Sequence, residues 1–517
     1  MTGLLSDTSL KYMRWIACAA ALLVFAFCIV KTIHWQIDWD QSVIRYVRFL
    51  MSHGMRPYSD ITDMNMPGCY LMEAWGTAVF GWSDLSWRIY EYVLIATLAI
   101  SGMVIGGRRY WLTGLYGSLI FLLVRFAEGE TFSMERNEVM AMLDLIAVAF
   151  FFIAMQRRKP VLFGISSFLI CLAATMKPWG YLLELILLGV LTVTLRREKV
   201  SLGRYLLWAL AGNLVVALIT IAFLVREHAF HGFLFIIFNV WPLFKKISPH
   251  QNLAAHLIPK ALIPLTLLAI FAAYKNRATM GWQRWTLLLA AVSGIVSYKL
   301  EGSVVGYHRY VFIAFLATWI GWELTISMQR IEMKSRLVGV TGLVLLFGIV
   351  VPYYTLLIKR NVYTGTYIET YPAALQADLS SLGGDKLQGQ VECLEMLEGC
   401  LRTLYDMRLV QNTGSTGDLL LFEPQNGPAV RYYRDWYTQS QSKNPANVVV
   451  LGNFWFQGDR RTFDKLNVWP QYADYLRDHY VLAKERHLGP GDAPAYRIYV
   501  RKGSDIPVPA ASPGTTP

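Results

Sequence analysis

The stretch from Gln36 to Gly68 concentrates acidic and basic side chains between two long apolar runs. It begins with Asp38 and Asp40, and apolar residues then recur at the spacing of one helical face, with Arg45 and Arg48 on the opposite face. This pattern predicts an amphipathic helix on a membrane surface, with a basic face available to an anionic group. A simpler alternative is that Asp38 or Asp40 caps the helix and the arginines lie level with the lipid phosphates.

The composition is typical of a chain that crosses a lipid bilayer many times. Of the 517 residues, 55% are hydrophobic and only 16% are charged, and the mean hydropathy is +0.36. Apolar runs of spanning length recur, so we predict a polytopic α-helical membrane protein with about eleven crossings. The predicted crossings are 15–30, 87–105, 111–126, 139–155, 161–176, 181–195, 205–225, 254–274, 282–298, 310–326 and 337–357.

The positive charges support this count and give a predicted orientation. The formal net charge is +12, but the lysines and arginines fall mostly in alternate short loops, as the positive-inside rule requires. We therefore predict an inner (plasma) membrane protein with a cytoplasmic N-terminus, in contact with membrane lipids and without a nucleic-acid partner. The apolar segment 69–82 is short and contains Glu73; counting it as a crossing would reverse every basic loop, so we predict an interfacial or partly re-entrant helix.

Everything after about residue 359 is predicted to lie on the periplasmic or extracellular side. The strand-like runs "DLLLFEP", "NVVVLGN" and "AYRIYVRK", with a helical segment at 469–482, indicate a small extracytoplasmic α/β domain. We place a transmembrane domain at 1–358, with its first outer loop at 31–86, the α/β domain at 359–505 and a disordered tail at 506–517. Cys393 and Cys400 either form a disulfide or remain two buried thiols.

The first outer loop also carries a family resemblance. The sequence "DWDQSVIRYVRFLMSHGMRPYSDITDMNMPGCYLMEAWGTAVFG" resembles that loop in GT-C membrane glycosyltransferases, most closely the branch of protein O-mannosyltransferases and the lipid A aminoarabinose transferase. Asp40 stands where the Asp of that family's Asp-Glu pair would be, and Tyr58 and Asp60 fit its Pro-Tyr-x-Asp turn. The segments "MERNEVMAMLDLIAVAF", "TMKPWGYLL" and "KLEGSVVGYHRYVFIAFLATWIG" continue the match in the family's order.

The resemblance implies a GT-C fold and an enzyme that transfers a sugar, with inversion, from a polyprenyl-phosphate donor to an acceptor hydroxyl outside the cytoplasm. Such a reaction needs a carboxylate to take the hydroxyl proton, for which Asp40 is the candidate and Asp38 the reserve. It also needs groups that stabilise the departing phosphate. The candidates for this role are Arg45, Arg136, Lys177, His308 and Arg309, and those for substrate binding are Tyr58, Asp60, Asp63 and Glu301.

The sequence departs from the family pattern at three positions. Gln41 replaces the Glu of the acidic pair, Asn65 replaces a Lys that contacts phosphate, and Asn137 replaces a carboxylate of the second outer loop. The last change removes a natural metal ligand, so no cofactor is certain and a divalent cation stays an open question. Nearby carboxylates that would substitute as ligands are Glu130, Glu135 and Glu138.

The basic candidates also have structural explanations. Lys177, His308 and Arg309 can anchor the membrane interface, Arg136 can pair with a neighbouring glutamate, and Glu301 can be a surface charge. The aromatic-rich loop 226–256 contains four histidines without metal-binding spacing, so an interfacial belt and a groove for the donor lipid are favoured there over zinc.

The alternative function is a transporter or flippase for a lipid-linked sugar. Such proteins place decisive polar groups near the bilayer midplane, often in two similar halves. We find no internal repeat in the sequence, and the ionisable residues at the centres of the crossings are few, chiefly Asp144 and Glu184. We therefore favour a cell-envelope glycosyltransferase acting on a protein, lipid or glycan. No motif in the sequence identifies the sugar or the acceptor.

Overall fold

The computed structural model describes residues 6–247, 256–277, 281–302, 305–360, 367–455, 460–488 and 494–507. The chain forms two compact units. Unit 1 comprises Met1–Gln36, Met66–Thr220 and His250–Asn361, and unit 2 comprises Ile37–Asn65, Ile221–Pro249 and Val362–Pro517. The sequence predicted one division near residue 358; the structure also separates the chain from 362 onward, but groups 37–65 and 221–249 with it.

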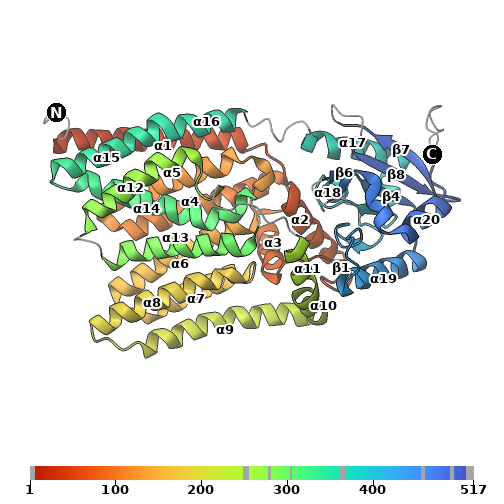
Figure 1. Ribbon diagram of the computed structural model, residues 1–517, viewed down its shortest axis with the longest axis horizontal. Helices are drawn as coiled ribbons and strands as arrows, with labels where there is room; N and C mark the ends of the chain where they lie inside the picture. Colours follow the sequence, from red (N-terminus) through yellow and green to blue (C-terminus); the bar gives the residue numbers. More distant parts are fainter. Residues whose placement is uncertain are drawn as a thin grey trace. The chain divides into compact units, whose positions relative to one another are not determined.

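Unit 1 consists of long helices that lie side by side in a bundle (Figure 1). Helices are expected here, because a backbone surrounded by lipid must satisfy its hydrogen bonds internally. The helices are α1 (Asp7–Thr32), α3 (Pro67–Phe80), α4 (Asp84–Tyr110), α5 (Leu112–Ala127), α6 (Arg136–Arg157), α7 (Pro160–Ala174), α8 (Tyr181–Arg197), α9 (Gly203–Arg226, which enters unit 2 at residue 221), α12 (Ile263–Lys275), α13 (Trp282–Glu301), α14 (Tyr310–Gln329), α15 (Met333–Leu345) and α16 (Val351–Arg360). Shorter turns are η1 (Glu130–Phe132), η2 (Pro178–Gly180), η5 (Lys260–Leu262), η7 (Gly306–Arg309) and η8 (Leu346–Val350).

Within the described residues, eight helical segments are long and apolar enough to cross a membrane. All but one coincide with predicted crossings; the exception, Phe230–Ile247, lies in the segment predicted to be an interfacial loop. The predicted crossings at α5 and α7 are apolar but shorter helices, and α12 begins at Ile263, later than predicted because the chain before it forms a 3-10 turn. Residues 248–255 of the aromatic loop and 508–517 of the predicted tail lie outside the described residues.

Helix α14 is the centre of unit 1 and packs against α4, α5, α6, α13 and α15 (Figure 1). Its whole apolar window is buried. Small residues allow the close approach, because a Cβ atom on Gly321 would lie 2.7 Å from the Thr113 carbonyl oxygen and one on Gly117 would lie 3.0 Å from Thr318 Cα. This packing gives a rigid support to the residues immediately before α14, which include His308 and Arg309.

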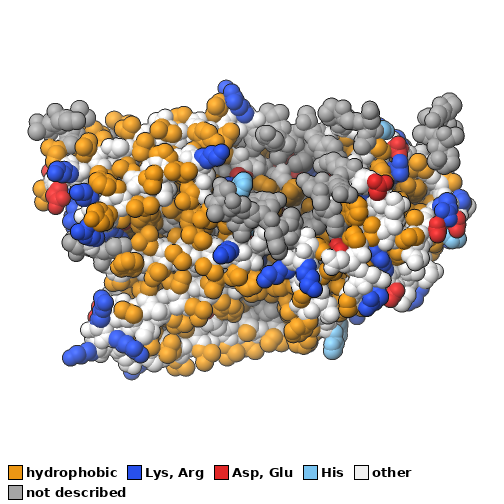
Figure 2. All heavy atoms as spheres, in the orientation of Figure 1, with side chains coloured by type: hydrophobic (Ala, Val, Ile, Leu, Met, Phe, Trp, Pro, Cys, Tyr) orange, Lys and Arg blue, Asp and Glu red, His pale blue; other side chains and the backbone are white. Residues whose placement is uncertain are grey.

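The outer helices of unit 1 show the opposite pattern. On α9 the large residues Leu207, Leu210 and Val225 are at least 60% exposed, and Figure 2 shows hydrophobic side chains covering much of the helical surface, with lysines and arginines near helix ends. A continuous apolar surface of this kind would be a liability in water but is what lipid requires. The chain is therefore a multi-pass membrane protein by its helices and their surface.

Unit 2 contains a four-stranded mixed sheet in the order β2–β4–β8–β7. Strand β4 lies parallel to β2 and antiparallel to β8, and all five of its residues are buried. The strands of unit 2 are β1 (Ile61–Thr62), β2 (Val391–Leu394), β3 (Gly414–Ser415), β4 (Val448–Gly452), β5 (Phe454–Trp455), β6 (Arg460–Arg461), β7 (Tyr480–Arg486) and β8 (Tyr496–Arg501). The helices and turns are α2 (Trp39–Ser52), α10 (Phe230–Phe235), η3 (Ile236–Val240), α11 (Trp241–Ile247), α17 (Tyr367–Leu382), η9 (Gly384–Leu387), α18 (Cys400–Asp406), α19 (Pro428–Lys443), η10 (Phe463–Val468) and α20 (Pro470–His479).

The α/β character predicted for the C-terminal region is confirmed, but not every element is. Two of the three predicted strands are β4 and β8, whereas "DLLLFEP" forms turns in which Leu419, Leu421 and Phe422 are buried and Asp418 pairs with Lys465. The predicted helix at 469–482 ends at His479, where β7 begins. Cys393 and Cys400 form a disulfide that joins β2 to the first residue of α18.

Candidate active site

Two aspartates stand at the start of α2 in unit 2. Asp38 is the N-cap residue and is 4% exposed, but its side chain makes no capping hydrogen bond. The capping explanation therefore does not hold for Asp38. Asp40 lies in the first turn and is half-buried. Trp39 between them has φ 45°, a left-handed conformation that costs a non-glycine residue about 1–3 kcal/mol and is found preferentially at functional sites.

Helix α2 is amphipathic as predicted, but its partner is protein. Helix α2 packs on α18 within unit 2, and Arg45, predicted on a free basic face, is only 1% exposed. The Arg45 Nη1 donates to the Tyr405 hydroxyl at 3.4 Å, and the guanidinium lies 5.9 Å from the centre of that ring. The prediction of an accessible Arg45 is wrong, because α18 covers the face that the sequence pattern alone assigned to solvent.

The predicted substrate-binding residues of the first loop serve the loop's own structure. Arg56 donates two hydrogen bonds to Asp60 through Nε and Nη2, at 2.8 and 2.9 Å, and these bonds hold the pKa of Asp60 below its usual value. Tyr58, with φ 62°, donates its hydroxyl proton to the Asn65 carbonyl at 2.5 Å. Asp63 accepts from the Asn65 side-chain amide, at 3.0 Å to each carboxylate oxygen. The loop is thus held in one shape by short-range polar contacts.

In unit 1, the predicted cations Lys177 and His308 converge on the predicted substrate ligand Glu301. The Lys177 Nζ lies 2.5 Å from one Glu301 oxygen, and the His308 Nε2 lies 3.3 Å from the same atom. Asn137 donates to the other Glu301 oxygen at 2.8 Å. A carboxylate at position 137 would repel Glu301, which gives a physical reason for the asparagine there. We call Asn137, Lys177, Glu301 and His308 the Glu301 cluster.

Tyr307 and Glu128 contact the other two predicted basic residues, Arg136 and Arg309. Arg136 Nη2 donates to the Tyr307 hydroxyl at 3.2 Å, and Lys177 Nζ lies 5.4 Å from the centre of the Tyr307 ring. Arg309 pairs with Glu128, whose other oxygen accepts from the Tyr310 hydroxyl at 2.7 Å. The sequence analysis did not single out Tyr307 or Glu128; the adjacency of Tyr307 to His308 was the available signal.

The Glu301 cluster is a partly accessible pair of basic side chains, Lys177 and His308, that share one carboxylate. Burial lowers the pKa of Lys177, and the Glu301 carboxylate acts in the opposite direction. Side-chain exposures are 15% for Lys177, 12% for His308 and 5% for Glu301, so water still reaches the cluster. A ligand phosphate can therefore replace or share the Glu301 carboxylate as the hydrogen-bond acceptor.

A second ionic network, which the sequence analysis missed, lies entirely inside unit 1. Arg125 donates to Glu91 at 2.9 Å and to Glu138 at 2.8 Å, and Arg88 donates to Glu91 at 2.7 Å. All of these side chains are 0% exposed. The network also binds the loop before α6, since Arg125 donates to the Gly129 carbonyl and the Met134 N–H donates to Glu138, both at 2.8 Å. This Arg125 network fixes the loop that leads into Arg136 and Asn137.

The carboxylates considered as substitute metal ligands do not form a metal site. Glu138 is paired with Arg125, and Glu130 accepts from the Gln36 N–H at 3.4 Å. The part of the chain that the structure describes holds no group of three or more His, Cys, Asp or Glu side chains arranged to bind a metal ion. These residues do not fit the metal ion that the family pattern suggests, and no step below uses one.

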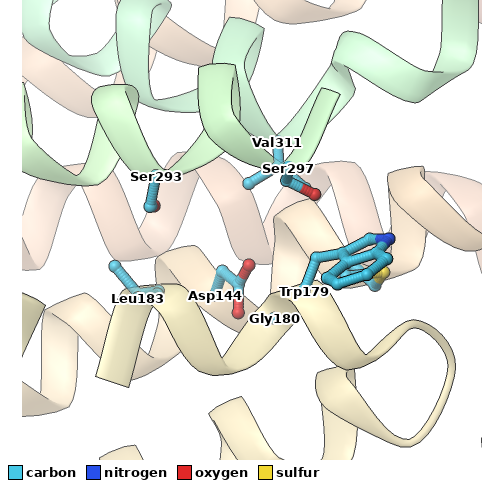
Figure 3. A pocket seen from close by; sticks show the side chains of 8 residues that line it. Asp144, Trp179, Gly180, Leu183, Ser293, Ser297 and Val311 are labelled. Carbon is cyan, nitrogen blue, oxygen red and sulfur yellow. The ribbon is translucent and has the colours of Figure 1, made fainter. Parts of the chain in front are cut away.

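A small cavity in unit 1 bears on the transport alternative. Asp144, Trp179, Ser293 and Ser297 are among the residues that line it (Figure 3). The cavity measures about 10 Å³, room for a single water molecule. Asp144 is 1% exposed, and its Oδ1 has no hydrogen-bond partner in the structure. A space of this size does not hold a sugar.

The predicted site residues thus divide between the two units. In unit 1, Lys177 and His308 contact Glu301, Arg136 contacts Tyr307, and Arg309 contacts Glu128. Unit 2 holds Asp38, Asp40, Arg45, Tyr58, Asp60 and Asp63.

No protein-family model matches the sequence, and no curated protein matches it. Solved structures match the fold over nearly the whole chain. One is ArnT from Cupriavidus metallidurans bound to undecaprenyl phosphate, with a TM-score of 0.50 and 14% identity over 94% of this chain and 98% of ArnT. Another is the archaeal oligosaccharyltransferase AglB from Archaeoglobus fulgidus in complex with an inhibitory peptide and a dolichol-phosphate, with a TM-score of 0.51 and 12% identity over 96% of this chain and 75% of AglB. The chain has the fold of the GT-C membrane glycosyltransferases.

Proposed function

We propose that this protein is a glycosyltransferase that moves a sugar from a polyprenyl-phosphate donor to an acceptor hydroxyl on the extracytoplasmic side of the membrane, with inversion at the anomeric carbon. The observation that carries the proposal is the Glu301 cluster, in which two partly accessible basic side chains meet in a chain with the GT-C fold. Two proteins with this fold, ArnT and AglB, were solved with a polyprenyl phosphate bound, which supports a lipid phosphate as the anion that the cluster receives.

Lys177 and His308 are the proposed ligands of the donor phosphate. Both are hydrogen-bond donors that already hold a carboxylate oxygen, and a phosphate oxygen has similar size, charge and acceptor geometry. Arg136 lies beside them through Tyr307 and adds a third positive group. As the bond between the sugar and the phosphate breaks, negative charge grows on the leaving polyprenyl phosphate, and these cations stabilise it.

Asp40 is the proposed general base, with Asp38 in reserve. The carboxylate takes the proton of the acceptor hydroxyl while that oxygen attacks the anomeric carbon from the side opposite the phosphate. The products are the glycosylated acceptor, the protonated aspartate and a polyprenyl phosphate. Half-burial of Asp40 is compatible with a base that must meet an acceptor from solvent.

The proposed topology has a cytoplasmic N-terminus and an external C-terminal region, in the inner or plasma membrane. The support is the alternation of basic loops along the sequence. Single cysteines introduced at Arg158 and at Asp474, tested with a membrane-impermeant thiol reagent in intact cells, check it. Labelling at position 474 and not at 158 is expected; the reverse pattern would invert the topology.

The test of the reaction is sugar transfer in membrane vesicles supplied with a panel of radiolabelled polyprenyl phosphate sugars. The native protein should transfer label and Asp40→Asn should lose nearly all of it, at equal expression and thermal stability. Asp474→Asn is the matched control, because Asp474 is an exposed acid of α20 in the same unit. Transfer that survives in Asp40→Asn moves the role to Asp38, and label that crosses the bilayer without being transferred indicates a flippase.

A further inference from the structure

The unit 2 part of the first outer loop, residues 37–65, contacts a short segment of the C-terminal region. This segment, residues 400–416, runs from α18 to just beyond β3, and we call it the anchoring segment. Strand β3 pairs with β1 in parallel, Ile61 opposite Gly414 and Thr62 opposite Ser415. The Thr416 hydroxyl adds a hydrogen bond to the Thr62 carbonyl at 2.7 Å.

Tyr46 attaches α2 to this segment through two hydrogen bonds. Its hydroxyl donates to the Leu409 carbonyl at 3.0 Å and accepts from the Gln411 N–H at 2.9 Å. The side chain is 0% exposed, so neither backbone group would find water in its place. Tyr46 therefore fixes both the position of α2 along the segment and its rotation about its own axis.

The anchoring segment is itself fastened to the sheet at two points of β2. The Cys393–Cys400 disulfide attaches its beginning. Near its end, the Glu392 carboxylate accepts from the Thr413 N–H at 2.9 Å and from the Thr413 hydroxyl at 2.6 Å. A continuous path of covalent and hydrogen-bonded contacts thus leads from the sheet to α2, which carries Asp40 in its first turn.

We propose that Tyr46 is a positioning residue for the proposed base, and that the C-terminal region acts in catalysis by holding Asp40 in place through the anchoring segment. The inference rests on the proposed function. Asp40 precedes Tyr46 by about 9 Å along the helix axis, at 1.5 Å per residue, so a tilt or rotation released at Tyr46 is transmitted to the carboxylate. A displacement of about 1 Å is enough to lower a reaction rate by about 10²-fold.

Tyr46→Phe tests this without changing any charge. Its matched control is Tyr437→Phe, because Tyr437 is equally buried in unit 2 and its hydroxyl bonds only to Tyr472, at 3.2 Å, away from α2. We expect Tyr46→Phe to lower kcat about tenfold or more while KM for the donor stays within about twofold of native. Tyr437→Phe should lower Tm to a similar degree and leave kcat near native.

Tyr405→Phe provides a second variant in case Tyr46→Phe folds poorly, because it removes the hydroxyl that Arg45 contacts and keeps the ring that fills the space. It should lower kcat by a smaller factor, again without a change in KM. If both interface variants keep kcat, or lose it only as far as Tyr437→Phe does, the positioning role is overturned while transfer by the native protein still stands. If the native protein transfers nothing from any donor, the proposed function fails, and the inference falls with it.

Discussion

Two ionic networks in unit 1 use the same chemistry and differ in how far water reaches them. In the Arg125 network every charged side chain is 0% exposed and is paired at 2.7 to 2.9 Å. In the Glu301 cluster the lysine and the histidine are 15% and 12% exposed. A closed network cannot exchange a partner for a ligand, whereas an accessible one can. The comparison teaches that accessibility, more than charge, separates a structural ion pair from a binding site.

The largest effect on stability is expected from a substitution inside the Arg125 network. Arg125→Met should destabilise the protein by about 3–5 kcal/mol, because it leaves Glu138 buried without its cation and removes one of the two arginines that pair with Glu91. Thermal unfolding in detergent measures this, with Lys177→Met as the comparison. Equal losses of Tm in the two variants would erase the distinction between the networks.

Lys177→Gln should leave the free energy of unfolding near its native value and weaken binding of the donor. A charge-assisted hydrogen bond contributes about 1.5–3 kcal/mol, so KM for a polyprenyl phosphate sugar should rise about 10- to 100-fold. Binding of unlabelled polyprenyl phosphate to the purified protein gives the same quantity without catalysis. A native affinity in this variant would remove Lys177 from the phosphate site.

Glu392 extends the comparison to a buried carboxylate with no cation beside it. Burial raises its pKa from 4.5 to about 8 against the hydrogen bonds from Thr413. Between these values the folded state binds more protons than the unfolded state, so the free energy of unfolding should fall as pH rises, by up to about 1.4 kcal/mol per pH unit. Thermal scans of the full chain across this window measure the slope, and Glu392→Gln should flatten it. An unchanged slope in that variant would assign the titration to another group, such as Glu395, whose pKa burial raises to about 7.

The smallest expected effect is the change in polyprenyl phosphate affinity caused by Glu301→Gln, and the direction of this change is what distinguishes two roles for Glu301. If phosphate and Glu301 compete for Lys177 and His308, removal of the charge should tighten polyprenyl phosphate binding about two- to fivefold. If Glu301 instead only orients the two cations, binding weakens. Titration of the purified variant with polyprenyl phosphate separates the two, because the predicted changes have opposite directions.

Hydropathy and loop charge were sufficient to predict the helical membrane architecture, because both are local properties of the sequence. They failed at Phe230–Ile247, where many aromatic residues suggested an interfacial loop and the structure has a continuous helix. Aromatic residues serve both purposes equally well, so composition alone does not distinguish them. The α/β region was predicted from β4 and β8, whose apolar runs fit strands, whereas "DLLLFEP" also has an apolar run and forms turns.

The sequence singled out the basic residues at the ends of crossings but not all of their contacts. The carboxylates that pair with Lys177 and Arg309 come from distant parts of the chain, Glu301 and Glu128. Arg45 shows the limit most clearly. Its helical face looked solvent-exposed, and only the fold reveals that Tyr405, 360 residues later, covers it.

Unit 2 joins early and late parts of the sequence, and this sets when its fold can be completed during synthesis. Helix α2 is translated long before the anchoring segment, and its apolar face includes Val43, Val47 and Leu50, all of which are buried in the finished fold. Until the C-terminal region has been synthesised, α2 lacks its contact with α18. The structure around α2 is therefore completed late, and a chain that terminates before residue 400 would lack both the α18 contact of α2 and the β3 partner of β1.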